Sequence, residues 1–178
     1  MKKMMFPVAA LLLLVVFAFS VITVQQWRIG SDYQVKFSGK YADGYFKTLK
    51  GTVVFDEQNP TAAKFDVVID VASINTGNWL KNKHARSAKW FDAEKYPEIR
   101  FTSTTVSRSG NQYVAQGILD MHGVKKTISI PFTFLKNGAG GVFNGQFKVN
   151  RSDFGLSSAS GNDSDYTQLT VTVPVTAH

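Results

Sequence analysis

Hydrophobic and polar residues alternate along most of the chain downstream of residue 33. The segments KFDVVIDVAS (64–73), TISIPFTF (127–134) and QLTVTVPV (168–175) each place apolar side chains at every second position. Successive side chains of a β-strand point to opposite faces of a sheet, so this period of two predicts strands with one buried face.

Shorter runs of the same kind predict five further strands, and turn-forming residues separate them. Segments such as DEQNP, SRSGNQ, MHGVKK and KNGAGG contain the glycine, proline, asparagine and aspartate residues that tight turns favour. With the three segments above, eight strands are expected in one all-β domain. Full closure of an antiparallel sheet removes its exposed edges, which favours an eight-stranded barrel over a sandwich. The five further strands are expected at residues 33–38, 49–56, 99–106, 113–121 and 142–149.

Two prolines lie inside these patterns. Pro131 and Pro174 both occupy positions of a predicted strand whose side chains face outward. Proline has no backbone N–H and cannot donate a hydrogen bond to a neighbouring strand. We therefore expect each of them to mark a sheet edge, a bulge or the end of a strand.

The strand positions whose side chains face inward are rich in phenylalanine, valine and isoleucine. An eight-stranded barrel either fills its interior with side chains or holds one small ligand. Small residues at these positions, Ser103 and Gly145, favour a cavity, although glycine also occurs where barrel strands bend. The side chains expected to line an apolar tunnel are Phe37, Phe55, Phe65, Val67, Ile69, Phe101, Phe132, Phe134, Phe147 and Val171.

Residues 73–101 connect two predicted strands and are too many for a simple turn. Asn78 is placed to cap a short helix over residues 79–86, because its side-chain oxygen can accept hydrogen bonds from the first free N–H groups. Leu80 and His84 are four residues apart and share one face of that helix.

The remainder of this segment predicts a second turn and a return to a strand. Asp92 can cap that turn, and Pro97 forces extended backbone on the residue before it. Long ordered loops usually carry function, so we expect the segment to form a lid over the barrel mouth. The expected mouth residues are Trp79, His84, Arg86, Trp90 and Phe91.

The chain begins with two lysines and an uncharged apolar stretch that ends at residue 24. This pattern is typical of an export signal. A small-residue site permits cleavage after Ser20, whereas the length of the stretch also suits an uncleaved helix that anchors the chain in a membrane. In both cases the domain, residues 27–178, is expected outside the cytoplasm, in the periplasm or secreted.

Composition narrows the function further. The chain contains no cysteine, which excludes disulfides, thiolate nucleophiles and cysteine-ligated metals. Its formal net charge of +7 favours anionic surfaces such as lipid head groups, although scattered cations are also typical of ordinary solubility. No basic block alternates with aromatic residues, so nucleic acid is not expected as a partner.

Candidate catalytic and metal-binding residues are few. No glycine-rich phosphate loop, HExxH or GxSxG motif occurs. His84 lies among basic residues with no evident carboxylate to orient it. Asp163 and Asp165 lack the fixed glycine and glutamate of a calcium loop. We therefore expect no catalytic residue, no metal and no cofactor.

Three separated motifs resemble the YceI-like, polyisoprenoid-binding proteins of bacterial envelopes. The first lies in residues 73–101 and contains SINTGN, His84 and YPEIRF. The second is the GILDMHGVKK hairpin at 117–126, and the third is VNRSDFG at 149–155. The similarity covers about residues 27–177, nearly all of the expected exported domain.

This resemblance implies an extended lipocalin-like antiparallel barrel whose apolar tunnel holds an isoprenoid lipid, such as a polyprenyl phosphate or a quinone tail. It implies no catalysis and no metal. The chain departs from the family at Lys81 and Asn82, where an Arg–Asp pair is common, and at Lys125, where threonine is usual. These departures concern head-group contacts and leave the implied fold unchanged.

We therefore predict a non-enzymatic protein that binds, transports or stores an isoprenoid lipid. The expected partners are that lipid and a membrane surface or the N-terminal anchor, and dimerisation is left open. One alternative is an envelope enzyme that acts on a lipid-linked substrate through His84 and a nearby carboxylate. Another is a structural or stress-related envelope module with a filled barrel and no ligand. An alanine at position 84 would abolish turnover in the enzyme and leave cargo in the carrier.

Overall fold

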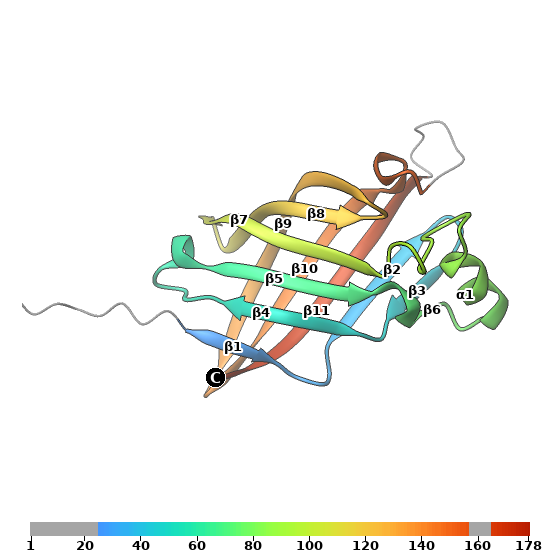
Figure 1. The fold of residues 1–178 in the computed structure, drawn as a ribbon. Helices are drawn as coiled ribbons and strands as arrows, with labels where there is room; N and C mark the ends of the chain where they lie inside the picture. The colour runs from blue at the N-terminus through green and yellow to red at the C-terminus, as the bar shows by residue number, and fades with distance from the viewer. Residues whose placement is uncertain (1–24, 157–164) are drawn as a thin grey trace, which may run out of the picture.

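The computed structural model describes residues 25–156 and 165–178, which form one antiparallel sheet closed into a barrel (Figure 1). Residues 1–24, the expected leader, and 157–164, which include Asp163, lie outside the described residues. Within the described ranges eight strands form the ring, and pairing of the first with the last closes it, as the sequence predicted. In ring order they are β1 (Gln26–Ile29), β4 (Leu49–Val54), β5 (Lys64–Asp70), β7 (Glu98–Ser109), β8 (Gln112–Met121), β9 (Val124–Asn137), β10 (Gly140–Asn150) and β11 (Tyr166–Ala177).

One strand of the ring differs from the sequence prediction. The strand expected at 33–38 is β2 (Gln34–Gly39), which pairs with the first half of β11 and not with β4. The ring is closed instead by β1, which pairs with the last residues of β11. β1 has only four residues, QWRI, which is too short a run for alternation to be recognised.

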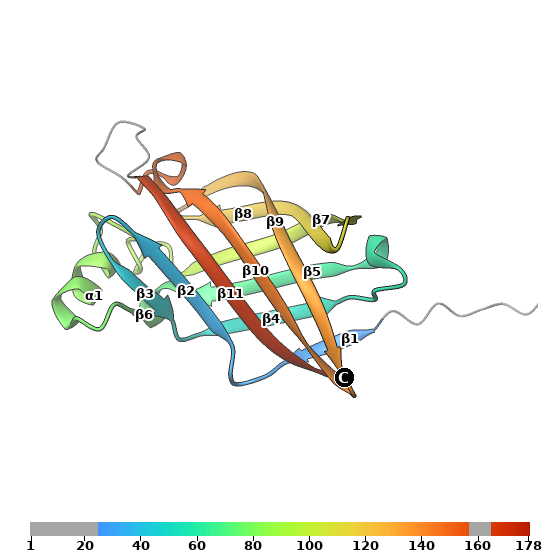
Figure 2. The ribbon, with the colours of Figure 1, turned by 180° about the vertical axis from the view of Figure 1, so that it is seen from behind.

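Three short strands widen the sheet at one end of the barrel. β2 continues to β3 (Asp43–Phe46), and β3 pairs with β6 (Ile74–Asn75). Figures 1 and 2 show α1 (Trp79–Arg86) beside β3 and β6, whereas β1 starts at the opposite end. The strands β4, β5 and β7 run at an angle to β10 and β11, in front of them in Figure 1 and behind them in Figure 2.

The helices are short. Within residues 25–156 the 3₁₀ helices are η1 (Pro60–Ala62), η2 (Val71–Ser73) and η3 (Arg151–Phe154), and the α-helix has eight residues. None of the helices in the described part of the chain is both long and apolar enough to span a bilayer.

The two outward-facing prolines mark changes of strand partner inside long strands. Pro131 precedes the point at which β9 begins to pair with β10, at Phe132. Pro174 lies between the part of β11 that pairs with β2 and the part that pairs with β1. The carbonyl of Pro174 accepts a hydrogen bond from the Gly30 N–H at 2.8 Å, so its missing N–H faces this change of partner. At Pro131 the ladder with β10 has ended, which fits the expected edge, whereas at Pro174 the strand β11 continues and only its partner changes.

Aromatic side chains fill the end of the barrel that contains β1. Phe55 is completely buried, and its ring contacts five others at centroid distances between 4.9 and 6.4 Å. The indole N–H of Trp27 donates to the carbonyl of Phe55 at 2.8 Å, which ties β1 to this cluster. Tilted and edge-to-face contacts of this kind stabilise an aromatic core beyond its buried area. The rings around Phe55 are Phe65, Tyr113, Phe132, Phe134 and Phe143.

Candidate ligand-binding site

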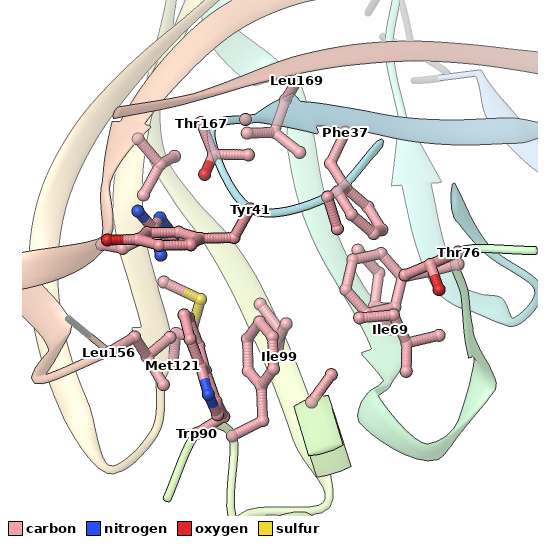
Figure 3. Close-up of a pocket in the computed structure, with 18 of the residues that line it drawn as sticks. Phe37, Tyr41, Ile69, Thr76, Trp90, Ile99, Met121, Leu156, Thr167 and Leu169 are labelled. Carbon is pink, nitrogen blue, oxygen red and sulfur yellow. The ribbon is translucent and has the colours of Figure 1, made fainter. Parts of the chain in front are cut away.

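The other half of the barrel encloses an apolar cavity of about 440 Å³ beneath α1. Alternate residues of β2, β8 and β11 face it, because every second side chain of a strand points to the same side. Figure 3 shows side chains from several strands converging on this space. The apolar side chains labelled there are Phe37, Ile69, Ile99, Met121, Leu156 and Leu169.

A second apolar cavity of about 170 Å³ lies between the first cavity and the aromatic end. Gly145 lines it, at the position where β10 separates from β9. The absent side chain leaves space between the neighbouring inward residues Phe143 and Phe147. The two cavities meet at one layer of side chains that lines both of them, formed by Val35, Ile69, Ile99, Leu119, Phe147 and Val171.

The ten side chains expected in the tunnel fall into four groups. Phe37 lines the larger cavity, and three residues line both: Ile69, Phe147 and Val171. Phe55 and Phe134 line neither cavity, because both pack inside the aromatic end of the barrel. The four that line only the smaller cavity are Phe65, Val67, Phe101 and Phe132.

The lid helix forms where the sequence predicts it. The side-chain oxygen of Asn78 accepts hydrogen bonds from the N–H groups of Leu80 and Lys81, both at 3.0 Å. The side chain of Asn82 accepts from the backbone and the hydroxyl of Thr76, both at 2.8 Å, and holds the helix against the preceding turn. These contacts turn Leu80 toward the larger cavity.

The expected mouth residues do not all face the cavity. His84, Trp90 and Phe91 line the larger cavity. Trp79 points away from it and is 74% exposed. Arg86 also lies outside the lining, and its guanidinium donates to the carbonyl of Ala72 at 3.3 Å.

The turn expected at Asp92 is present but is held by the backbone. The carbonyl of Asp92 accepts from the N–H groups of Lys95 and Tyr96 at 3.0 and 2.7 Å. Asp92 itself has a φ of 46°, in the left-handed region that aspartate tolerates better than most residues.

Sequence reasoning missed Arg151 as a mouth residue. Its guanidinium lies 4.9 Å from the ring centre of Tyr41 and 5.6 Å from that of Trp90, and it lines the cavity. Its Nη2 is 3.7 Å from a carboxylate oxygen of the buried Asp165. Arg151 therefore connects the lid, the β2–β3 turn and the start of β11. The RSDFG motif that contains it was recognised, but no local pattern shows which distant rings a side chain contacts.

The three sequence motifs meet beside this mouth. Tyr96, from the first motif, packs against the ring of His122, from the second, at a centroid distance of 4.8 Å. The Nδ1 atom of His122 lies 3.0 Å from the carbonyl oxygen of Phe154, in the third motif. Gly123 permits this approach, because a Cβ atom there would lie 2.6 Å from the ring of Tyr96. These residues join the lid to the barrel.

The mouth is positively charged. Lys40, Lys81 and Arg151 line the larger cavity together with His84. Within the described residues no carboxylate lies within ion-pairing distance of Lys40, Lys81 or His84. A side-chain hydrogen bond with the phenol of Tyr96 raises the pKa of the exposed Lys95 above its usual value.

Acid–base or metal chemistry would need several polar groups in mutual reach. Over the ranges that the structure describes, no group of three or more His, Cys, Asp and Glu side chains is placed to hold a metal ion. What the site provides is an enclosed apolar volume with cations at its opening, an arrangement that can bind an amphiphile. Fold and site therefore define a closed antiparallel barrel with an internal apolar pocket.

Comparison with known proteins identifies the family to which this chain belongs. The YceI-like domain matches residues 25–177, and the chain belongs to the YceI-like family. It is 36% identical over 136 residues to UPF0312 protein plu2095 of Photorhabdus laumondii, covering 73% of this chain and 71% of the relative. It is 30% identical over 165 residues to protein YceI of Escherichia coli O6:H1, covering 82% and 86%.

Solved structures share the fold. The crystal structure of BcnA from Burkholderia cenocepacia matches with a TM-score of 0.75 and 28% identity, covering 80% of this chain and 95% of BcnA. A polyisoprenoid binding domain from Saccharophagus degradans matches with a TM-score of 0.64 over 88% of this chain and all of that domain. Because the sequence of this domain is only 17% identical to this chain, the similarity shows a shared fold and nothing more.

Proposed function

We propose that this chain is a non-enzymatic carrier or store of an amphiphilic isoprenoid lipid outside the cytoplasm. The observation that carries the proposal is the apolar cavity of about 440 Å³ with cations at its opening. Membership of the YceI-like family supports it, as does the likeness in fold to a polyisoprenoid binding domain. A barrel filled from end to end would have no room for such a ligand, which weighs against a purely structural module.

The polar head of the lipid lies at the mouth in this proposal. Lys40 and Lys81 suit a phosphate, because ammonium groups donate charge-assisted hydrogen bonds to anionic oxygens. His84 can donate to a phosphate or to a neutral quinone oxygen. The cargo is therefore of the polyprenyl phosphate or the isoprenoid quinone type, and the cluster of lysines favours the phosphate.

Cavity size sets the length of chain that fits without rearrangement. The larger cavity has room for roughly fifteen methylene-sized groups, since a group of water size takes about 30 Å³. The smaller cavity adds roughly six more. Together they hold about four isoprene units. A chain that occupies both cavities must pass the shared side-chain layer, and a longer cargo must leave its end outside the mouth.

The energetics suit a protein that releases its cargo. Burying several hundred square ångströms of lipid chain is worth on the order of 10 kcal/mol relative to water. The lipid starts in a membrane, however, so the exchange has a net driving force of only a few kcal/mol. We place the protein in the periplasm or outside the cell, because the composition of residues 1–24 is typical of an export signal or anchor.

Titration of the delipidated full chain with defined amphiphiles tests this function. We expect saturable binding of one geranylgeranyl phosphate or short-tailed isoprenoid quinone per barrel, read from tryptophan fluorescence. Lys81→Gln should weaken binding of the phosphate and leave binding of geranylgeraniol, the uncharged alcohol, unchanged. The matched control is Lys83→Gln, because Lys83 is exposed and does not line the cavity. Absence of saturable binding for all three compounds would contradict the proposal.

A further inference from the structure

The most exposed large apolar side chains of the described residues gather mainly at the cavity mouth. Trp79 and Leu80 are neighbours at the start of α1 and are 74% and 59% exposed. Tyr41, on the β2–β3 turn, is exposed as well, and both Tyr41 and Leu80 line the rim of the cavity. We name Trp79, Leu80 and Tyr41 the rim patch. Leu135, on β9, is a comparable exposed residue near the opposite end of the barrel.

The segment that carries Trp79 and Leu80 is strongly basic. Residues 71–91 contain no aspartate or glutamate. Their lysines and arginine are exposed, and none forms an ion pair within the described part of the chain. The nearest acidic residues in sequence are Asp70 and Asp92, which flank the segment. The basic residues are Lys81, Lys83, Arg86 and Lys89.

We propose that the rim patch and these basic residues dock the barrel mouth on an anionic lipid bilayer. Tryptophan and tyrosine favour the head-group region of a membrane, where their rings are partly buried and their polar atoms stay hydrated. Clustered lysines and arginines add electrostatic attraction to anionic lipids, and each charge near the surface contributes measurably. The patch thus combines the two components that hold a protein at a membrane surface.

The position of the cavity favours a bilayer over an acidic protein as the partner. The cavity opens within the rim patch, so a docked barrel presents an apolar space to the lipid without an intervening layer of water. The inference goes beyond the proposed function, since it concerns where the carrier meets its source of lipid. It also does not depend on the leader, because β1 starts at the opposite end from α1 (Figures 1 and 2).

Fluorescence quenching of Trp79 by membrane lipids tests the docking. The full chain is mixed with vesicles of phosphatidylcholine and phosphatidylglycerol at 7:3, with part of the lipid nitroxide-labelled near the head group. We expect quenching that Trp79→Phe removes and that is lost in vesicles of phosphatidylcholine alone or in high salt. The difference between the wild type and Trp79→Phe separates the Trp79 signal from the emission of Trp27 and Trp90, so the readout holds whether residues 1–24 are cleaved or retained.

A double variant and a matched control separate docking from general surface effects. Lys83→Gln with Lys89→Gln keeps Trp79 and should weaken the vesicle affinity read from its quenching by about fivefold or more. Neither residue lines the cavity. Lys64→Gln with Lys136→Gln removes the same number of charges at the opposite end and should leave the Trp79 signal unchanged.

Two results would overturn the inference. One is that Trp79 emission is the same with and without anionic vesicles, which is also the result expected if the patch binds an acidic protein. The other is an equal loss of signal in the control variant.

Mass spectrometry of lipid extracted from the double variant distinguishes the docking proposal from the carrier proposal, because a carrier whose docking is impaired still holds cargo. A wild-type protein without cargo would contradict the carrier function and leave the docking result untouched.

Discussion

At the scale of single residues, the mouth depends on side chains that lie far apart in the sequence. Arg151 contacts the rings of Tyr41 and Trp90 and lies 3.7 Å from the carboxylate of Asp165. Only 11% of the Arg151 side chain is exposed and the Asp165 side chain is fully buried, so solvent screens this pair little. The pair and the two ring contacts hold the lid to the barrel.

Replacing Arg151 by alanine should lower the free energy of unfolding by about 2 to 3 kcal/mol, because it removes a charge partner of a buried carboxylate. Urea denaturation followed by circular dichroism measures this change. The control is Arg100→Ala, which breaks the exposed pair with Asp66 at 2.8 Å and should cost less than about 1 kcal/mol. If both variants lose the same free energy of unfolding, the contacts of Arg151 stabilise the fold no more than an exposed ion pair does.

Parity along a strand predicts which side chains point inward, but not whether the space they enclose is filled. Phe55 and Ile69 both have inward parity in the sequence analysis. The first is packed among aromatic rings, whereas the second lines both cavities. The difference arises from the summed volumes of side chains on several strands, and no local pattern contains that sum.

At the scale of elements, local signals predicted the lid helix well. Asn78 caps it through two hydrogen bonds of 3.0 Å, and Leu80 and His84 share the face toward the cavity. A helix of eight residues is marginal alone, so its cap and its packing must stabilise it. The strand β1 escaped prediction because four residues are too few to show a period.

Asn78→Ala should loosen the lid while the barrel stays folded. Loss of the cap costs the helix about 1 kcal/mol, which corresponds to roughly fivefold faster opening of residues 79–86. Amide hydrogen exchange measured by mass spectrometry detects this, and exchange in β8 and β10 of the same molecules serves as the internal control. Unchanged exchange in the helix would mean that packing alone holds the lid closed.

At the scale of the whole molecule, one end of the barrel is filled with aromatic rings and the other end is hollow. The two cavities meet at a single side-chain layer that includes Val171. Because β2 replaces β1 as the partner of β11 at the hollow end, the sheet there extends to β3 and β6 and supports the lid. This division gives the barrel a closed end and a mouth.

Val171→Trp should shorten the cargo by filling the layer between the cavities. The empty space beside Val171 accommodates a larger ring, so we expect overpacking to cost less than about 3 kcal/mol of stability. Thr170→Trp, at the outward-facing position next to it, is the matched control and should leave the cargo unchanged. Lipids bound to each variant are compared by mass spectrometry. Chains of the same length in both variants would show that the smaller cavity holds no part of the ligand.

Native mass spectrometry of the protein purified without added lipid, followed by extraction and identification of what it holds, tests the carrier function most directly. We predict a folded barrel with one bound amphiphile whose chain is isoprenoid. A fully folded protein that repeatedly holds no long-chain amphiphile would contradict this function.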